Sequence, residues 1–288
     1  MGVDISIRQG IFKKKKIDFA VFEELLNENN FYCGISNSVY VTEEYSGDDK
    51  INDLYFVVFS NNYGRGFTFY LDKNDNIEVR LNIPSTKSDI KEFYCFVKTL
   101  CNYLNLDSFI QDGEKQSLAD IEMLNERIEK VCQENLVDFI QEMDDLVIFG
   151  SMFPVVLEDY IIKEILASDD SLEVFERYLK EKNELDCYFA KPIIYQDDDG
   201  NVFGVYVVPE DCQTIFPLEA GIPFGYTLPD DLEISEWCVD VGGIVDNEYE
   251  TLAKLKFDEF QDMIDFTKLE AFDKKHIILN INREQLKK

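Results

Sequence analysis

The chain carries hydrophobic residues at two characteristic spacings, and these spacings predict both strands and helices. Residues 1–9 alternate between apolar and polar side chains, as in a strand that buries one face. The segments 67–71 and 77–83 flank a polar run rich in Asp and Asn, which predicts an antiparallel hairpin. Further elements are expected as strands at residues 35–42 and 53–60 and a short helix at residues 18–28.

Two longer segments show the three-to-four-residue spacing of amphipathic helices. The first is expected to begin at Asp89, because Asp89 and Glu92 form an acidic start of the capping-box type, and to run to Leu104. The second is expected to begin at Ser117, with an acidic residue three positions later, and its apolar stripe continues to Ile140. Its repeat is too short for a coiled coil, so we interpret it as a core helix.

The second half of the chain is predicted to repeat this mixture of helices and strands. A hairpin is expected where strands at residues 187–195 and 202–208 flank a polar turn. The segment 209–236 contains four prolines and is interpreted as a long irregular loop, while Gly242 and Gly243 are interpreted as a turn. The remaining expected elements are helices at residues 158–167, 171–182 and 251–266 and strands at residues 236–241 and 276–282.

The order of these elements indicates the fold class. Helices separate some strands, but the regular strand–helix–strand alternation of a parallel sheet is missing. The pattern predicts an α+β fold with two packed lobes, each containing an antiparallel hairpin or sheet and amphipathic helices. We expect an N-terminal lobe at residues 1–144 and an acidic C-terminal lobe at residues 145–288, which carries the proline-containing loop. A chain of 288 residues with 45% hydrophobic residues is long enough for both cores.

Acidic residues dominate the charge of this chain. There are 58 acidic and 28 basic residues, which gives a formal net charge of -30. Between Asp186 and Glu250 the sequence has fifteen Asp and Glu residues and one basic residue, Lys191. A field of this sign repels phosphate backbones, which argues against nucleic-acid binding, and attracts basic proteins or metal cations. The alternative is that the charge serves only to keep the protein in solution.

Familiar catalytic and ligand-binding motifs do not fit these residues. The single histidine, His276, is expected at the edge of the last strand, with no nucleophile motif near it. The motif at residues 64–66 has too few glycines for a dinucleotide-binding loop. Aligning Gly200 with the glycine of a calcium-binding EF-hand puts tyrosines at two ligand positions, so residues 197–201 and 72–76 are both interpreted as hairpin turns. We therefore assign no catalytic, cofactor-binding or metal-binding residue.

Cysteine usage and the N-terminal sequence bear on the cellular location. The seven cysteines include no CxxC pair, which is typical of reduced thiols in a cytoplasmic protein. Residues 1–6 fit a myristoylation pattern, and the lysines at residues 13–16 add a basic cluster. A first strand explains the N-terminal pattern better, because anionic lipid repels an acidic protein. With no apolar run of transmembrane length, we expect a cytoplasmic protein without membrane contact.

The predicted loop at residues 209–236 is unusual because it combines prolines with large apolar side chains. One interpretation is an extended segment that folds over the core. The functional interpretation is a partner-binding loop with apolar anchors inside an acidic rim. The residues expected to contact a partner are Asp197, Asp198, Asp199, Phe216, Phe224, Tyr226, Asp230 and Asp231.

Three short motifs resemble those of one known family. The sequences YGRGF at residues 63–67 and RLNIPST at residues 80–86 are similar to a family of Firmicutes proteins defined by domain of unknown function 4299. The N-terminal ISIRQ at residues 5–9 and the following lysines are similar as well. The resemblance covers most of the chain and implies a bacterial cytoplasmic protein of about this length. It implies no activity and no catalytic residue.

These observations predict a non-enzymatic interaction protein whose acidic C-terminal lobe binds a basic protein partner. One specific form is an immunity protein or a nucleic-acid mimic that covers a basic active site. The alternative is an enzyme that uses carboxylates, with or without a metal, in a cleft between the lobes. We assign no oligomeric state from the sequence.

Overall fold

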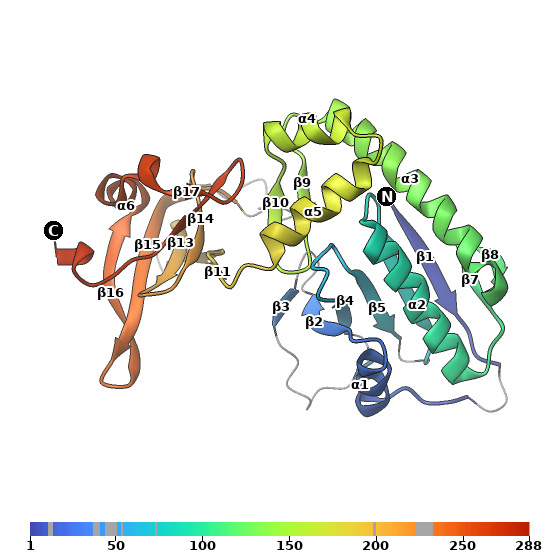
Figure 1. Ribbon diagram of the computed structural model, residues 1–288. Helices are drawn as coiled ribbons and strands as arrows, with labels where there is room; N and C mark the ends of the chain where they lie inside the picture. The colour runs from blue at the N-terminus through green and yellow to red at the C-terminus, as the bar shows by residue number, and fades with distance from the viewer. Residues whose placement is uncertain are drawn as a thin grey trace. The chain divides into compact units, whose positions relative to one another are not determined.

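The structure, a computed structural model, describes residues 1–10, 14–36, 41–43, 51–52, 54–72, 74–197, 200–222 and 233–287. The chain forms two compact units, Met1–Glu184 and Leu185–Lys288, and both combine helices with sheets (Figure 1). The predicted α+β class is therefore confirmed. The division between the units lies after Glu184 and not after residue 144, because the helices that follow residue 144 pack within the first unit.

In the described part of the chain, the first unit is built on an eight-stranded sheet with antiparallel neighbours. Its strands lie in the order β3-β2-β4-β5-β6-β1-β7-β8. The predicted N-terminal strand is confirmed and lies inside the sheet, between β6 and β7. The strand bounds are β1 Gly2–Ile7, β2 Tyr32–Ser36, β3 Val41–Glu43, β4 Tyr55–Phe59, β5 Phe67–Leu71, β6 Ile77–Asn82, β7 Ser108–Gln111 and β8 Glu114–Ser117.

The hairpin of β5 and β6 forms as predicted, with Leu71 opposite Ile77. Asp72 fixes the turn, because its Oδ1 accepts the backbone N–H groups of Asn74 and Asn76 at 2.7 and 2.8 Å. Asp and Asn are frequent between strands because their side chains form such bonds. This acidic segment is therefore a turn, as the sequence indicates.

Two helices, α1 (Phe19–Asn27) and α2 (Lys87–Leu104), pack an aromatic core against this sheet. Phe22 of α1 stacks on Phe69 of β5 with ring centroids 4.6 Å apart. Phe96 of α2 meets Phe69 edge to face at 5.8 Å. All three side chains are buried, so the apolar stripes predicted for both helices face the sheet.

The starts of α2 and of the next helix are set by capping residues. Thr86 caps α2, and Asp89 occupies the third helical position of a capping box. The prediction that Asp89 opens this helix is wrong, because the cap is formed three residues earlier. The prediction for Ser117 is confirmed, since it caps a short 3-10 turn (Leu118–Asp120) that leads into α3 (Ile121–Glu142).

The segment that follows α3 stays in the first unit. The strands β9 (Val147–Phe149) and β10 (Pro154–Val156) form an antiparallel pair. They precede α4 (Asp159–Ala167) and α5 (Ser171–Asn183), which lie where the sequence predicts helices. Because α5 contacts α2 and α3 and buries Phe175, this segment belongs to the first unit and not to a second lobe.

The described residues of the second unit form two four-stranded sheets, in the orders β12-β13-β15-β16 and β11-β14-β18-β17. The pairs β13–β15 and β11–β14 are parallel, whereas the sequence indicates antiparallel pairing. The bounds are β11 Tyr188–Phe189, β12 Pro192–Gln196, β13 Val202–Pro209, β14 Thr214–Pro217, β15 Ile234–Val245, β16 Glu248–Lys256, α6 Phe257–Ile264, β17 Glu270–Ala271, β18 His276–Leu279 and 3-10 turns at Phe266–Lys268 and Gln285–Lys287.

One predicted helix of this unit is largely a strand. The sequence predicts a helix at residues 251–266, but Glu248–Lys256 is β16, and α6 begins only after it. The cause lies in the preceding turn, where Asp246 and Asn247 have φ values of 49° and 68°. Two consecutive positive φ values define a type I′ hairpin turn, which directs the following residues back along β15.

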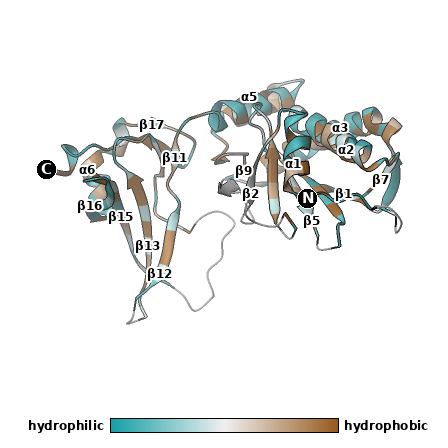
Figure 2. Cartoon of the chain, turned by 90° about the horizontal axis from the view of Figure 1, so that it is seen from below, coloured by the Kyte–Doolittle hydropathy of each residue, from teal (hydrophilic) through white to brown (hydrophobic). Residues whose placement is uncertain are grey.

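The region predicted as one loop at residues 209–236 is partly regular. β14 pairs with β18, and Phe216 on β14 is buried in the core of the unit, 5.2 Å from the ring of Phe260 on α6. β13, an interior strand, carries long hydrophobic stretches in Figure 2. Residues 223–232 of the predicted loop lie outside the described residues. The prediction of one irregular loop is therefore wrong for β14, which is a regular strand inside the core and not a segment folded over it.

Candidate functional site

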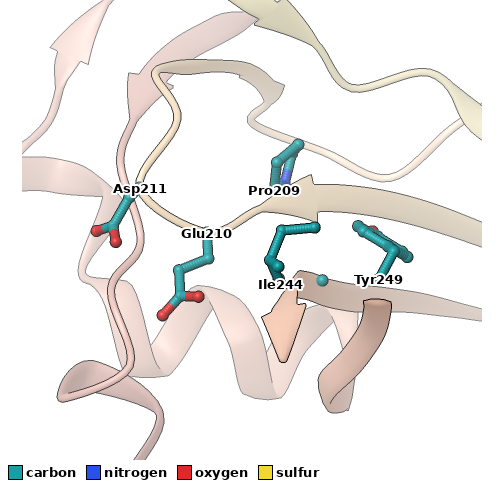
Figure 3. A pocket seen from close by; sticks show the side chains of 7 residues that line it. Pro209, Glu210, Asp211, Ile244 and Tyr249 are labelled. Atoms are coloured by element: carbon teal, nitrogen blue, oxygen red, sulfur yellow. The ribbon is translucent and has the colours of Figure 1, made fainter. Parts of the chain in front are cut away.

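A pocket opens in the second unit where β13 ends beside β15. β13 stops at Pro209, opposite Gly242, while β15 continues to Val245. The backbone N–H of Glu210 donates to the carbonyl of Gly242 at 2.7 Å, which keeps the departing chain close to β15. The pocket is open to solvent, has a volume of about 410 Å³ and is lined by Pro209, Glu210, Asp211, Gly242, Gly243, Ile244 and Tyr249 (Figure 3).

The wall that carries the two acidic residues is held from its other side by the C-terminal part of the chain. Glu210 forms a parallel bridge with Ile281, and the N–H of Asp211 donates to the Ile281 carbonyl at 2.8 Å. Asp211 has a φ of 55°, in the left-handed region that Asp tolerates better than most residues. Glu210 and Asp211 therefore extend from a fixed segment just after β13 (Figure 3).

Gly242 and Gly243 shape the pocket. A Cβ at Gly242 would stand 1.8 Å from the hydroxyl of Tyr249, so the tyrosine ring lies directly against this glycine. A Cβ at Gly243 would stand 2.5 Å from Oε2 of Glu210. The prediction of a turn at these glycines is wrong, because both lie inside β15. Their missing side chains allow Tyr249 and Glu210 to approach the strand.

One carboxylate oxygen of the pocket binds a guanidinium of this same chain. Arg283 donates from Nε to Oε1 of Glu210 at 2.6 Å and from a terminal nitrogen to the carbonyl of Ile244 at 2.7 Å. The hydrogen bond to Glu210 raises the pKa of Arg283. The side chain of Glu210 is only 10% exposed, so this charge-assisted bond offsets part of the cost of burying its charge.

Two large apolar side chains of the pocket are exposed to solvent. Ile244 and Tyr249 are cross-strand partners on β15 and β16, with exposed fractions of 60% and 58%. Asp246, Glu248 and Glu250, from the same hairpin, are exposed as well. Apolar anchors surrounded by polar and charged residues are typical of protein interfaces.

Cations from later in the chain neutralise part of the acidic stretch at residues 186–250. The ion pairs are Lys256–Glu236, Lys254–Asp240 and Arg283–Glu210. Exposed carboxylates outside these pairs, in the described part of the stretch, are Asp186, Asp211, Glu219, Glu233, Asp246, Glu248 and Glu250. The pairing reduces the negative charge of the stretch without removing it.

Two of the eight residues predicted to contact a partner lie in the described part of the chain. Asp197 lies in the turn between β12 and β13, where it accepts the backbone N–H of Asn201 at 2.8 Å. Phe216 is fully buried between β11 and β18, so its prediction as a contact residue is wrong. The others lie outside the described residues: Asp198, Asp199, Phe224, Tyr226, Asp230 and Asp231.

The residues that form the pocket are not predicted from the sequence. Glu210 and Asp211 fall in a segment interpreted as a loop, and Tyr249 precedes a segment interpreted as a helix. The available signal is the pair Asp246-Asn247, since two turn-forming residues between an apolar run and a segment that alternates around Tyr249 indicate a type I′ hairpin. That signal predicts β16 and hence the pairing of Tyr249 with β15.

A buried carboxylate, Asp89, organises the polar interior of the first unit. Its Oδ1 accepts the N–H of Gly66 at 2.8 Å, and its Oδ2 accepts the N–H of Arg65 at 2.9 Å. Oδ2 also accepts the hydroxyl of Thr86 at 2.6 Å. Burial raises the pKa of Asp89, while these hydrogen bonds favour its ionised form. The YGRGF and RLNIPST motifs therefore meet at one side chain.

The guanidinium of Arg65 extends this network to the next segment of the unit. It donates to the carbonyl of Phe149 on β9 at 3.1 Å and to the carbonyl of Pro84. Burial lowers the pKa of Arg65 to about 10, and the nearby Asp89 opposes that change. Because these donors are directed at backbone carbonyls, the arrangement is structural.

Other groups with catalytic or ligating chemistry are placed as follows. His276 is the first residue of β18, at the edge of the last strand as predicted, and its side chain is buried. Its Nδ1 lies 2.9 Å from Oδ1 of Asp273. All seven cysteines are free thiols. Among the described residues, no group of three or more His, Cys, Asp or Glu side chains is placed to hold a metal ion. Within that same part of the chain, no helix has the length and apolar composition to span a membrane.

Comparison with known proteins gives a family for this α+β chain. The model of a domain of unknown function, DUF4299, matches residues 2–288. The chain therefore belongs to the DUF4299 family, and the resemblance seen in its motifs is confirmed. No curated protein and no solved structure matches the chain.

Proposed function

We propose that this chain is a non-enzymatic interaction protein of the bacterial cytoplasm whose second unit binds a basic protein partner. The observation that supports this proposal is the exposure of Ile244 and Tyr249 beside a pocket and among exposed carboxylates. An immunity protein or a nucleic-acid mimic that covers a basic active site is one form of this function.

The charged and the apolar groups of this surface contribute to binding in different ways. Exposed carboxylates attract a basic partner and speed its association, chiefly at low ionic strength, because the screening length falls to about 10 Å at 0.1 M salt. Ile244 and Tyr249 contribute at short range, where their burial removes apolar surface from water. Binding should therefore weaken as salt rises.

Two charge-matched variants test whether the hairpin of β15 and β16 carries this function. Both remove three negative charges, one set from the hairpin and one from the exposed face of α3 in the first unit. The hairpin variant is Asp246→Asn, Glu248→Gln and Glu250→Gln, and the α3 control is Glu122→Gln, Glu126→Gln and Asp138→Asn.

Each variant and the wild-type protein are immobilised and exposed to bacterial lysate at low and high salt. The proposal expects a basic protein, identified by mass spectrometry, to be retained at low salt by the wild type and the α3 control. That protein should be released by salt and lost from the hairpin variant. Equal retention by both variants, retention that ignores salt, or no retained basic protein at low salt would show that the proposal is wrong.

A further inference from the structure

The pocket after β13 supports a more specific inference, which rests on the proposed function. We infer that it receives an arginine side chain of the basic partner. The guanidinium binds the carboxylate of Glu210 and is attracted by that of Asp211, which lies on the far side of Glu210 from Ile244 and Tyr249 in Figure 3. The aliphatic stem lies along Ile244 and Tyr249. The pocket would then supply the central anchor of the interface.

The chain itself shows that this wall binds a guanidinium. Arg283 engages Oε1 of Glu210 and the carbonyl of Ile244 with two separate nitrogens. Both acceptors belong to residues that line the pocket. A planar group with several donors in fixed directions therefore matches acceptors already placed at this wall.

Acceptors remain for a second guanidinium. In the part of the chain that the structure describes, no hydrogen bond is found to Oε2 of Glu210 or to the carboxylate of Asp211. Oε2 lies beside Gly243, and both residues line the pocket. A largely buried carboxylate gains more from a charged donor than an exposed one does, because water screens the interaction less.

Arginine suits this pocket better than lysine. Guanidinium is less strongly hydrated than ammonium, binds carboxylates with two nitrogens and stacks on aromatic rings. Tyr249 offers such a ring, since more than half of the residue is exposed. The volume of about 410 Å³ leaves room for an arginine side chain. Glu210, Asp211 and the paired Arg283 together carry one net negative charge, which disfavours an anionic ligand.

Peptide titration of the isotope-labelled full-length protein tests the inference. The probe is the blocked peptide Gly-Leu-Arg-Leu-Gly, and the matched controls carry lysine or norleucine at the central position. We expect saturable shifts of the amide resonances of Asp211, Gly243 and Ile244 with the arginine peptide. The lysine peptide should bind at least tenfold more weakly, and the norleucine peptide should not bind.

Two variants locate the binding site without changing the charge of the protein. Gly243→Ala places a methyl group against Oε2 of Glu210, and Tyr249→Ala removes the stacking surface. Each should weaken binding of the arginine peptide at least tenfold. Tyr195→Ala, at another exposed tyrosine of the same sheet, should leave it unchanged. Because Tyr249 is exposed, its variant keeps the test decisive if Gly243→Ala does not fold.

The possible results separate this inference from the proposed function. Resonance shifts confined to other residues, equal binding of the lysine or norleucine peptide, or unchanged binding by both pocket variants would overturn the inference. Salt-dependent retention of a basic partner without peptide binding at the pocket refutes the inference alone. Absence of a retained basic partner from every immobilised form refutes the proposed function.

Discussion

The carboxylate of Asp89 accepts the backbone N–H of Gly66 at 2.8 Å and so ties the loop between β4 and β5 to the first turn of α2. The two residues belong to segments that carry the family resemblance. Asp89 is 2% exposed, so water does not compete for its hydrogen bonds. Its removal should therefore affect the stability of the first unit.

Replacing Asp89 with Asn should destabilise the protein by about 2–4 kcal/mol. The Asn side chain has only one acceptor oxygen. Its NH₂ group would replace the second carboxylate oxygen and would face N–H groups that now donate hydrogen bonds to that oxygen. Urea denaturation measures the loss. Asp138→Asn, at an exposed position on α3, is the control and should change stability by less than about 0.5 kcal/mol. Equal denaturation midpoints for both variants would contradict the structural role of Asp89.

Three glycine-to-alanine variants should form a graded series. Gly66 has a φ of 66°, and a Cβ there would stand 2.5 Å from the carbonyl oxygen of Val58, so strain and a clash combine. Gly113 has a φ of 87° with nothing within 4 Å, so only backbone strain remains, at roughly 1–2 kcal/mol. Gly10 has neither feature. The loss of thermal stability should be largest for the Gly66 variant, smaller for the Gly113 variant and smallest for the Gly10 variant. A Gly113 variant that melts at a lower temperature than the Gly66 variant would exclude a clash at Gly66.

The carboxyl group of Glu92 should make stability depend on pH. Burial raises the pKa of Glu92, and hydrogen bonds from Ser60 and Asn62 oppose that rise. A raised folded-state pKa stabilises the protein below the ordinary carboxyl value of about 4.3, and this contribution is lost as pH rises through the raised value. The ionised group is therefore unfavourable at neutral pH.

The variant Glu92→Gln tests this sign. Ser60 and Asn62 both donate to one oxygen of Glu92 at 2.7 Å, and the Gln side chain retains such an acceptor. At pH 7 the variant should melt at the same or a higher temperature than the wild type, and any advantage should vanish in acid. Glu142→Gln, at an exposed position at the end of α3, serves as the control. If the stability of the variant relative to wild type is lower at neutral pH than in acid, the conclusion that folding raises the pKa of Glu92 is wrong.

Moderate salt should stabilise the whole chain. A formal net charge of -30 causes self-repulsion, and added ions screen it. Melting midpoints should rise from dilute buffer to about 0.15 M sodium chloride, where the screening length is about 8 Å. Glucose at the same osmolality should not reproduce the rise. A midpoint that does not change with salt would mean that like charges do not crowd in the folded protein.

The division after Glu184 can be tested with two fragments. A fragment of residues 1–184 keeps α5 with its buried Phe175 against α2 and α3 and should melt cooperatively. A fragment of residues 1–144 lacks α4 and α5, both of which contact α3, and so exposes apolar surface of α3 that they cover. It should aggregate or lack near-ultraviolet circular dichroism. Cooperative melting of both fragments at similar temperatures would favour a division near residue 144.

Elements that depend on hydrogen bonds between residues close together in the chain could be predicted from the sequence. Asp72 closes the hairpin of β5 and β6 through atoms two and four residues away, and Ser117 caps the turn that leads into α3. Such contacts form between neighbours, so composition and spacing record them. β16 could not be predicted from its periodicity, because pairing with β15 outweighs the helical preference of residues 251–256.

The sequence by itself determined the α+β class, the family and the acidic character of the second half. Only the tertiary structure decided that Glu210, Gly242, Tyr249 and Arg283 come together, and that Phe216 is buried in the core. The physical reason is that the pocket depends on pairing between segments far apart in the chain. Its shape comes from where β13 leaves β15 and from the missing side chains that admit Tyr249 and Glu210, and neither has a local signature.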